Sequence, residues 1–168
     1  MFFGRFFEAD PGISNPHPAN ACTLFGVVLE NSIEEFIERF RTDAASGNLY
    51  PQPEGSVLLE FVAAGQVVYL FDRTGPYTAK PGPARVIVHP VLKTFSPSEI
   101  QEESLVVTQI SALEGVGKIT RTEKGFLIVQ AKMPLVCGLL DHEQPDLKPG
   151  DWIRFETRPP THGFYLVK

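Results

Sequence analysis

The sequence predicts an α+β protein that is mostly β, with an N-terminal antiparallel sheet and one helix, followed by an all-β part. Its 15 prolines and 14 glycines are spread along 168 residues and separate many short apolar runs, as turns separate strands. Only one segment has the spacing of an amphipathic helix. The composition, 43% hydrophobic and 21% charged, is that of a globular chain with a core and excludes a wholly disordered one.

The first residues are unusually aromatic. Phe2, Phe3, Phe6 and Phe7 precede a loop rich in proline and glycine. These rings either complete the core, where apolar residues usually lie, or form a hydrophobic segment that contacts a partner. We keep the second alternative as a partner-binding hypothesis. Arg5 interrupts the run, so no signal-peptide core forms.

The segment from about 32 to 45 is the predicted helix. Ser32 and Glu35 form a capping box, which satisfies exposed amides at a helix start. An apolar stripe follows at helical spacing: Ile33, Phe36, Ile37 and Phe40. Gly47 lies at or just after the expected end.

The N-terminal part, residues 1–98, contains several predicted strands. Residues 22–30 are expected to form one strand. The runs 56–62 and 66–72 form a hairpin about Gly65. Residues 84–89 form a further strand, which Pro90 is expected to end. The polar stretch 93–103 is predicted to be a connector.

The C-terminal part, residues 104–168, is a series of short apolar runs separated by turn residues. The predicted strands are 105–110, 116–121, 126–131, 135–139, 152–156 and 164–167. Residues 159–163 are expected to form a rigid turn between the last two. Short strands at this spacing predict a small barrel or sandwich. No internal repeat is apparent.

Part of this segment resembles a cold-shock domain. Residues 115–129 (GVGKITRTEKGFLIV) are similar to the family's first two strands, and residues 147–156 (LKPGDWIRFE) to its fourth. Residues 163–167 would be the fifth. The resemblance covers 115–168 and implies a small OB-like β-barrel.

The family binds single-stranded nucleic acid by stacking bases on surface aromatics, and most of these are absent here. Ile119, Thr120 and Ile128 stand at family aromatic positions. Stacking contributes roughly 1–3 kcal/mol per base, so the resemblance implies the fold more than the activity.

A basic strip remains as the alternative, a single-stranded nucleic-acid site. It consists of Lys118, Arg121, Lys124, Phe126 and Lys132, with Glu123 as the one acidic residue between 115 and 134. A basic strip on a barrel can follow a phosphate backbone. Equally, exposed lysines protect strand edges from aggregation.

No motif indicates catalysis or a bound group. The chain lacks GxSxG, HExxH and the glycine-rich phosphate loops. Asp141, His142 and Glu143 are adjacent, and consecutive side chains converge poorly on a metal. Cys137 lies in an apolar run where a thiol stays protonated. We therefore predict no cofactor and no metal site, and an enzyme of unrecognised type is the third hypothesis.

Charge and cysteine content restrict partner and compartment. A net charge of −5 argues against generic attraction to nucleic acid or an anionic membrane. No run approaches the roughly 20 apolar residues that span a bilayer, and two distant cysteines are typical of a reducing cytoplasm. The leading hypothesis is a cytoplasmic, non-enzymatic protein-interaction or assembly module that binds a protein partner or itself.

Overall fold

The structure is a computed structural model, and it describes residues 23–24, 27–28, 32–75, 78–140 and 146–167. Over these residues the chain is mostly β with one α-helix, α1 (Ile33–Phe40), as predicted. A 3-10 turn, η1 (Arg41–Asp43), follows α1. No described helix is long and apolar enough to cross a membrane.

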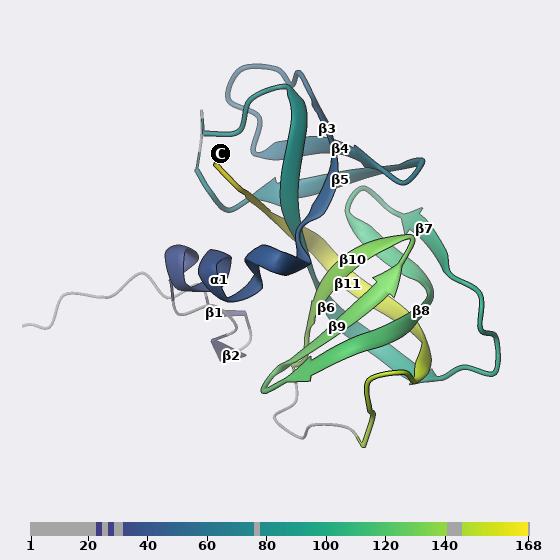
Figure 1. The fold of residues 1–168 in the computed structure, drawn as a ribbon. Coiled ribbons are helices and arrows are strands. Elements are labelled where there is room, and N and C mark those ends of the chain that lie inside the picture. Colours follow the sequence, from purple (N-terminus) through teal and green to yellow (C-terminus); the bar gives the residue numbers. More distant parts are fainter. Residues whose placement is uncertain (1–22, 25–26, 29–31, 76–77, 141–145, 168) are drawn as a thin grey trace, which may run out of the picture.

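The strands form one nine-stranded sheet and a separate two-stranded one (Figure 1). The two-stranded sheet pairs β1 (Thr23–Leu24) with β2 (Val27–Val28), so the prediction of one strand over 22–30 is wrong. The large sheet has the order β11-β5-β4-β3-β6-β10-β9-β8-β7. Its members are β3 (Ala45–Tyr50), β4 (Leu58–Ala63), β5 (Gln66–Asp72), β6 (Gly82–Pro97), β7 (Ser104–Thr108), β8 (Ala112–Glu123), β9 (Phe126–Ala131), β10 (Met133–Gly138) and β11 (Trp152–Tyr165).

The molecule has two lobes in Figure 1, one with β3, β4 and β5 and the other with β7 to β10. The two long strands, β6 and β11, pair antiparallel and run through both lobes. The first part of β6 pairs with β3, and Val91 further along pairs parallel with β10. The first part of β11 pairs with β8, and His162 further along pairs parallel with Phe71 of β5. Each long strand therefore joins the hairpins of its own lobe to those of the other.

This pairing is a structural repeat, although no internal repeat is apparent in the sequence. β3, β4, β5 and β6 are connected as β8, β9, β10 and β11 are. Gly47 and Gly117 occupy matching positions, since a Cβ on either would overlap a carbonyl of the next strand, that of Val62 or Gln130. Gly47 is thus needed inside β3 for a close backbone approach, and it does not end the helix.

Both long strands continue through prolines that were expected to interrupt them. Arg158 pairs with Val91 and His162 pairs with His89, so Pro90 faces a bulge formed by residues 159–161. At a bulge the ladder is locally broken and the missing amide of a proline leaves no partner unsatisfied. The predicted strand end at Pro90 and the predicted turn at 159–163 are therefore wrong. The predicted connector also begins later, because β6 continues to Pro97.

The helix begins as predicted and ends early. The Glu35 amide donates to Ser32 Oγ at 3.0 Å, which is half of the predicted capping box. Phe36 and Phe40 are buried against Phe126 and Phe164. The helix ends at Phe40 rather than near 45 because β3 begins at Ala45 and pairs with β6.

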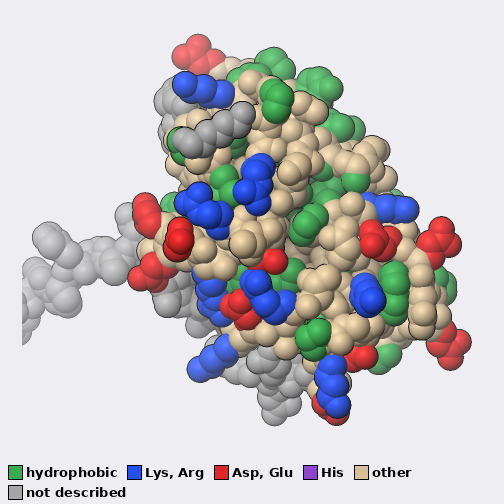
Figure 2. Space-filling view, viewed as in Figure 1, with side chains coloured by type: hydrophobic (Ala, Val, Ile, Leu, Met, Phe, Trp, Pro, Cys, Tyr) green, Lys and Arg blue, Asp and Glu red, His purple; other side chains and the backbone are tan. Residues whose placement is uncertain are grey.

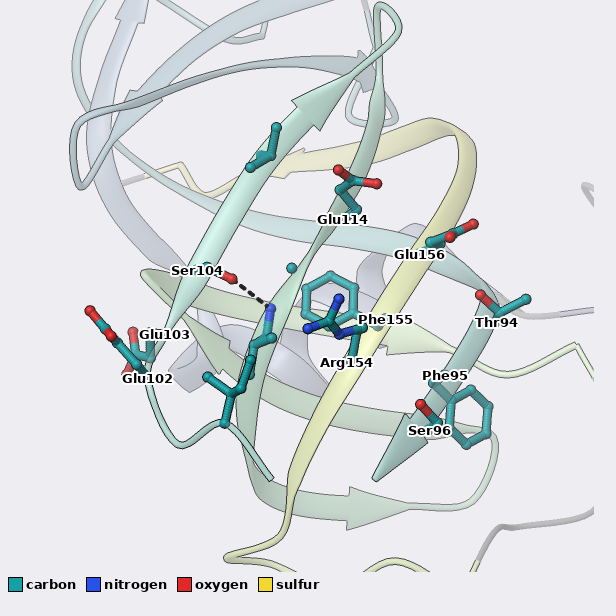
Figure 3. Close-up of a pocket in the computed structure, with 14 residues that line it drawn as sticks. Thr94, Phe95, Ser96, Glu102, Glu103, Ser104, Glu114, Arg154, Phe155 and Glu156 are labelled. Atoms are coloured by element: carbon teal, nitrogen blue, oxygen red, sulfur yellow. Dashed lines mark hydrogen bonds between the residues drawn. The ribbon is translucent and has the colours of Figure 1, made fainter. Parts of the chain in front are cut away.

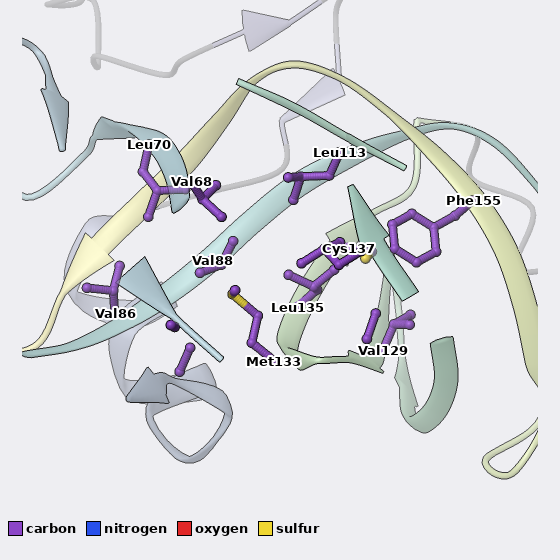
Figure 4. Close-up of a cluster of buried hydrophobic side chains, with 14 of the residues drawn as sticks. Val68, Leu70, Val86, Val88, Leu113, Val129, Met133, Leu135, Cys137 and Phe155 are labelled. Atoms are coloured by element: carbon purple, nitrogen blue, oxygen red, sulfur yellow. The ribbon is translucent and has the colours of Figure 1, made fainter. Parts of the chain in front are cut away.

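The main core draws residues from both sequence halves (Figure 4). Val68, Val86 and Val88 belong to the same cluster as Leu135 and Phe155. The division into parts 1–98 and 104–168 stays a prediction. Because residues of both halves belong to one core cluster, a test must separate the two halves.

Candidate functional site: a groove between β6 and β7

The predicted partner-binding residues Phe2, Phe3, Phe6 and Phe7 lie outside the described residues. The partner-binding hypothesis for these rings therefore stays a prediction.

Phe126, the one aromatic in the predicted basic strip, is a core residue. It is 4% exposed, and its ring centroid lies 5.0 Å from that of Phe40. The Arg39 guanidinium lies over its ring at 5.1 Å. Helix α1 thus covers the ring, and no face is open on which a base could stack.

Arg121 is held in ion pairs. Its Nη2 lies 2.7 Å from Asp43 Oδ2 and 3.0 Å from Glu123 Oε1. Arg39 Nε lies 2.6 Å from the other oxygen of Glu123. These contacts connect α1 and η1 to the end of β8, so the guanidinium has a structural role.

The three lysines of the strip, Lys118, Lys124 and Lys132, are exposed. Lys118 lies on β8 opposite Trp152, which is half-buried. Lys124 lies in the β8–β9 turn, and the Lys132 amide donates to Glu103 Oε2 at 2.6 Å. The face drawn in Figure 2 mixes acidic and basic side chains rather than gathering one large basic patch. The five predicted residues therefore do not share one open surface.

A groove of about 650 Å³ lies on the outer face of β6, β11, β8 and β7 (Figure 3). Two cross-strand rows of residues form its floor. One row is Ser96, Arg154, Val116 and Ser104, and the next is Thr94, Glu156, Glu114 and Val106. The alternation of each strand turns Ile153, Phe155 and Leu105 into the core, which leaves these rows facing outward.

The groove is acidic around one guanidinium. Glu102, Glu103, Glu114 and Glu156 line it together with Arg154. Glu114 and Glu156 are direct cross-strand neighbours, and like charges so placed repel. Lys93 Nζ lies 3.4 Å from Glu156 Oε2. Within the described part of the chain, the guanidinium of Arg154 has no hydrogen bond or ion pair.

Apolar side chains line the groove on the side of β7. Ile100 and Val106 are 50% and 51% exposed there. On the opposite side, the half-buried Phe95 of β6 also lines the groove (Figure 3). No local motif predicts this site, because it combines residues from four segments between Thr94 and Glu156. The one signal in the sequence is the uncharged run 104–108 after Glu102 and Glu103.

A smaller groove of about 390 Å³ occupies the matching place in the other lobe. Arg85 pairs there with Ser46 of β3, as Arg154 pairs with Val116 of β8. The Arg85 guanidinium donates to the carbonyl oxygen of Arg41 at 2.9 Å. The chain itself thus supplies the acceptor in the smaller groove.

The next feature is the placement of the residues that could carry out chemistry or bind a metal. Cys137 is fully buried, and its burial raises the pKa of the thiol well above its ordinary value. Among the residues that the structure describes, no three His, Cys, Asp or Glu side chains form a metal-binding group. Asp141, His142 and Glu143 lie outside them.

Comparison with known proteins adds no relative. No protein-family model, curated protein or solved structure matches this chain.

Proposed function

We propose that this chain is a non-enzymatic protein-interaction module, in the cytoplasm, that binds its partner in the groove between β6 and β7. The observation that carries the proposal is the unpaired Arg154 in a concave face lined by exposed Ile100 and Val106. Protein-binding surfaces combine such apolar area with arginine and a polar rim.

We also propose that the groove lies on an OB-like barrel. In support, β8, β9, β10, β6 and β11 pair in that order, and β11 pairs again with β8. All of these pairs are antiparallel except β10 with β6. In this arrangement the fifth strand is the end of β6, and not residues 163–167 as the cold-shock resemblance implies.

Photo-crosslinking tests the interaction. A photoreactive phenylalanine analogue replaces Val106 in cells that express the protein, and adducts are identified after irradiation. The matched control places it at Val67, which is 44% exposed on β5. A partner adduct formed from position 106 and absent from 67 is expected. Equal labelling at both sites, or none at 106, would count against the groove.

Single-stranded nucleic-acid binding is the second candidate, and the exposed Lys118 beside half-buried Trp152 favours it. An anisotropy titration of labelled single-stranded DNA and RNA at low and moderate salt tests it. Steeply salt-dependent binding that is lost in Lys118→Glu/Lys124→Glu would support this function. Absence of binding at low salt would remove it.

A further inference from the structure

We propose that the groove binds an extended peptide segment in which basic and apolar side chains alternate, with a main-chain carbonyl of the peptide accepting from Arg154. This inference rests on the proposed function and specifies the chemistry of the partner.

The smaller groove indicates what Arg154 lacks. Arg85, the matching residue, donates to the backbone carbonyl of Arg41, in the segment that precedes β3. In the larger groove the segment that precedes β8 is β7, which pairs with β8. No carbonyl of the described residues accepts a hydrogen bond from the Arg154 guanidinium. A bound polypeptide backbone supplies the acceptor that the chain provides for itself in the other lobe. Charge-assisted hydrogen bonds of this kind are among the stronger polar contacts.

The glutamates that line the groove favour basic side chains in the bound segment. Four glutamates line the groove together with Arg154. Glu114 and Glu156 are direct neighbours on β8 and β11 and repel each other, and Lys93 Nζ lies 3.4 Å from Glu156 Oε2. A lysine or arginine placed between them relieves that repulsion. Electrostatic complementarity of this type favours a cationic partner over an anionic one, which also distinguishes a peptide from a nucleic acid at this site.

The apolar side of the groove favours a peptide in which apolar and basic side chains alternate. Val106 and Glu114 are direct neighbours in one cross-strand row, so apolar and acidic surfaces lie side by side. In an extended segment, successive side chains point to opposite sides. A segment with alternating lysine and valine therefore presents one kind of side chain to the glutamates and the other to Val106 and Ile100.

Fluorescence anisotropy with a labelled hexapeptide of alternating Lys and Val tests the proposal on the full chain. Two comparison peptides have alternating Glu and Val, or three Lys followed by three Val. The alternating basic peptide is expected to bind most tightly, and Glu114→Gln should weaken it about threefold. Glu54→Gln removes the same charge from an exposed site outside the groove and is the matched control.

Arg154→Met separates the proposal from attraction by net charge. The variant makes the chain more acidic, so nonspecific attraction predicts tighter binding of the basic peptide. Loss of the carbonyl contact predicts the opposite, a weakening of about tenfold. The control is Lys80→Met, which removes one positive charge from an exposed position and should not weaken binding.

Three results would overturn the proposal: equal effects of Glu114→Gln and Glu54→Gln, tighter binding by Arg154→Met, or no binding of the alternating peptide. Each is distinguishable from failure of the proposed function. A Val106 adduct with a partner, together with no peptide binding, would leave the interaction module and remove this partner chemistry.

Discussion

The guanidinium of Arg121 and the carboxylate of Asp43 lie 2.7 Å apart and join the turn after α1 to the end of β8. Glu123 contacts both Arg121 and Arg39, so four charged side chains hold the helix against the second half of the chain. The aromatic rings of Phe40 and Phe126 lie directly beside this cluster. Arg121, which the sequence assigned to a nucleic-acid site, therefore helps to hold the helix against the sheet.

Replacing Arg121 should lower stability. Arg121→Met is expected to reduce the free energy of unfolding by about 1 kcal/mol, the order found for partly exposed ion pairs. Urea unfolding of Arg121→Met, Asp43→Asn and the double variant measures the coupling between the two residues. Lys124→Met, at an exposed turn position, is the control and should change little. Additive effects of the two substitutions would show that the pair contributes nothing of its own.

Gly115 should be intolerant of a side chain. A Cβ at this position would overlap the backbone carbonyl of Ser104, so Gly115→Ala forces β7 away from β8. Overpacking of this kind costs about 1–3 kcal/mol. We expect a lower Tm and faster amide exchange at Leu105 and Val107, with little change in β4. Unchanged exchange in β7 would contradict the close approach.

The Cys137 thiol makes stability depend on alkaline pH. Burial raises its folded pKa well above the value of 9.0 for an exposed thiol. The unfolded thiol loses its proton above about that pH while the folded one keeps it. The stabilising contribution is therefore complete below pH 9.0 and falls by about 1.4 kcal/mol per pH unit above it.

Urea unfolding at mildly and strongly alkaline pH checks this dependence. In a Cys22→Ser background, the chain with Cys137 should lose more stability with rising pH than Cys137→Ala does. A thiol reagent should label Cys137 only after denaturation. Rapid labelling of the native chain would show that the thiol is accessible.

Local signals allowed some elements to be predicted. The helix start at Ser32, the strand 66–72 and the strand 126–131 follow from a capping residue and from apolar runs bounded by turns. Each of these depends on residues close together in the chain. The predictions for β6 and β11 were wrong, because both strands continue where Pro90 faces the bulge at 159–161. The prediction of one strand over 22–30 was wrong as well, since β1 and β2 pair with each other there.

The groove could not be predicted from the sequence, because it also depends on pairing between residues far apart in the chain. Arg154 and Val106 are ordinary outward residues of two strands, and what brings them together is the pairing of β11 and β7 on either side of β8. The burial of Phe126 likewise depends on α1, more than 80 residues earlier in the chain. The structural repeat could not be predicted from the sequence either. Arg85 and Arg154 occupy matching positions in the strand pairing of the two lobes, but no extended sequence motif around them is repeated.

Deleting residues 1–7 tests the N-terminal hypothesis. If Phe2, Phe3, Phe6 and Phe7 contact a partner, the truncated chain should keep its Tm and lose partner binding or self-association. Thermal unfolding and sedimentation velocity of the two forms measure both properties. Loss of the folded state on truncation would assign these rings to the core instead.

Separating the two sequence halves tests whether they are independent domains. A fragment of residues 99–168 keeps β7 to β11 and lacks β6, which pairs with both β10 and β11. The complementary fragment 1–98 lacks β11, the partner of β5 and β6. Each fragment thus has unpaired strand edges and an open core.

We expect each fragment alone to show poor amide dispersion and no cooperative unfolding, and the equimolar mixture to recover the spectrum of the intact chain. Recovery follows because the long strands of the two fragments pair with each other, as exchanged elements do in domain-swapped dimers. The control is a mixture of fragment 99–168 with a fragment 1–81, which ends before β6 and should not restore folding. A cooperative transition in 104–168 alone would instead show that the C-terminal part is a self-sufficient barrel.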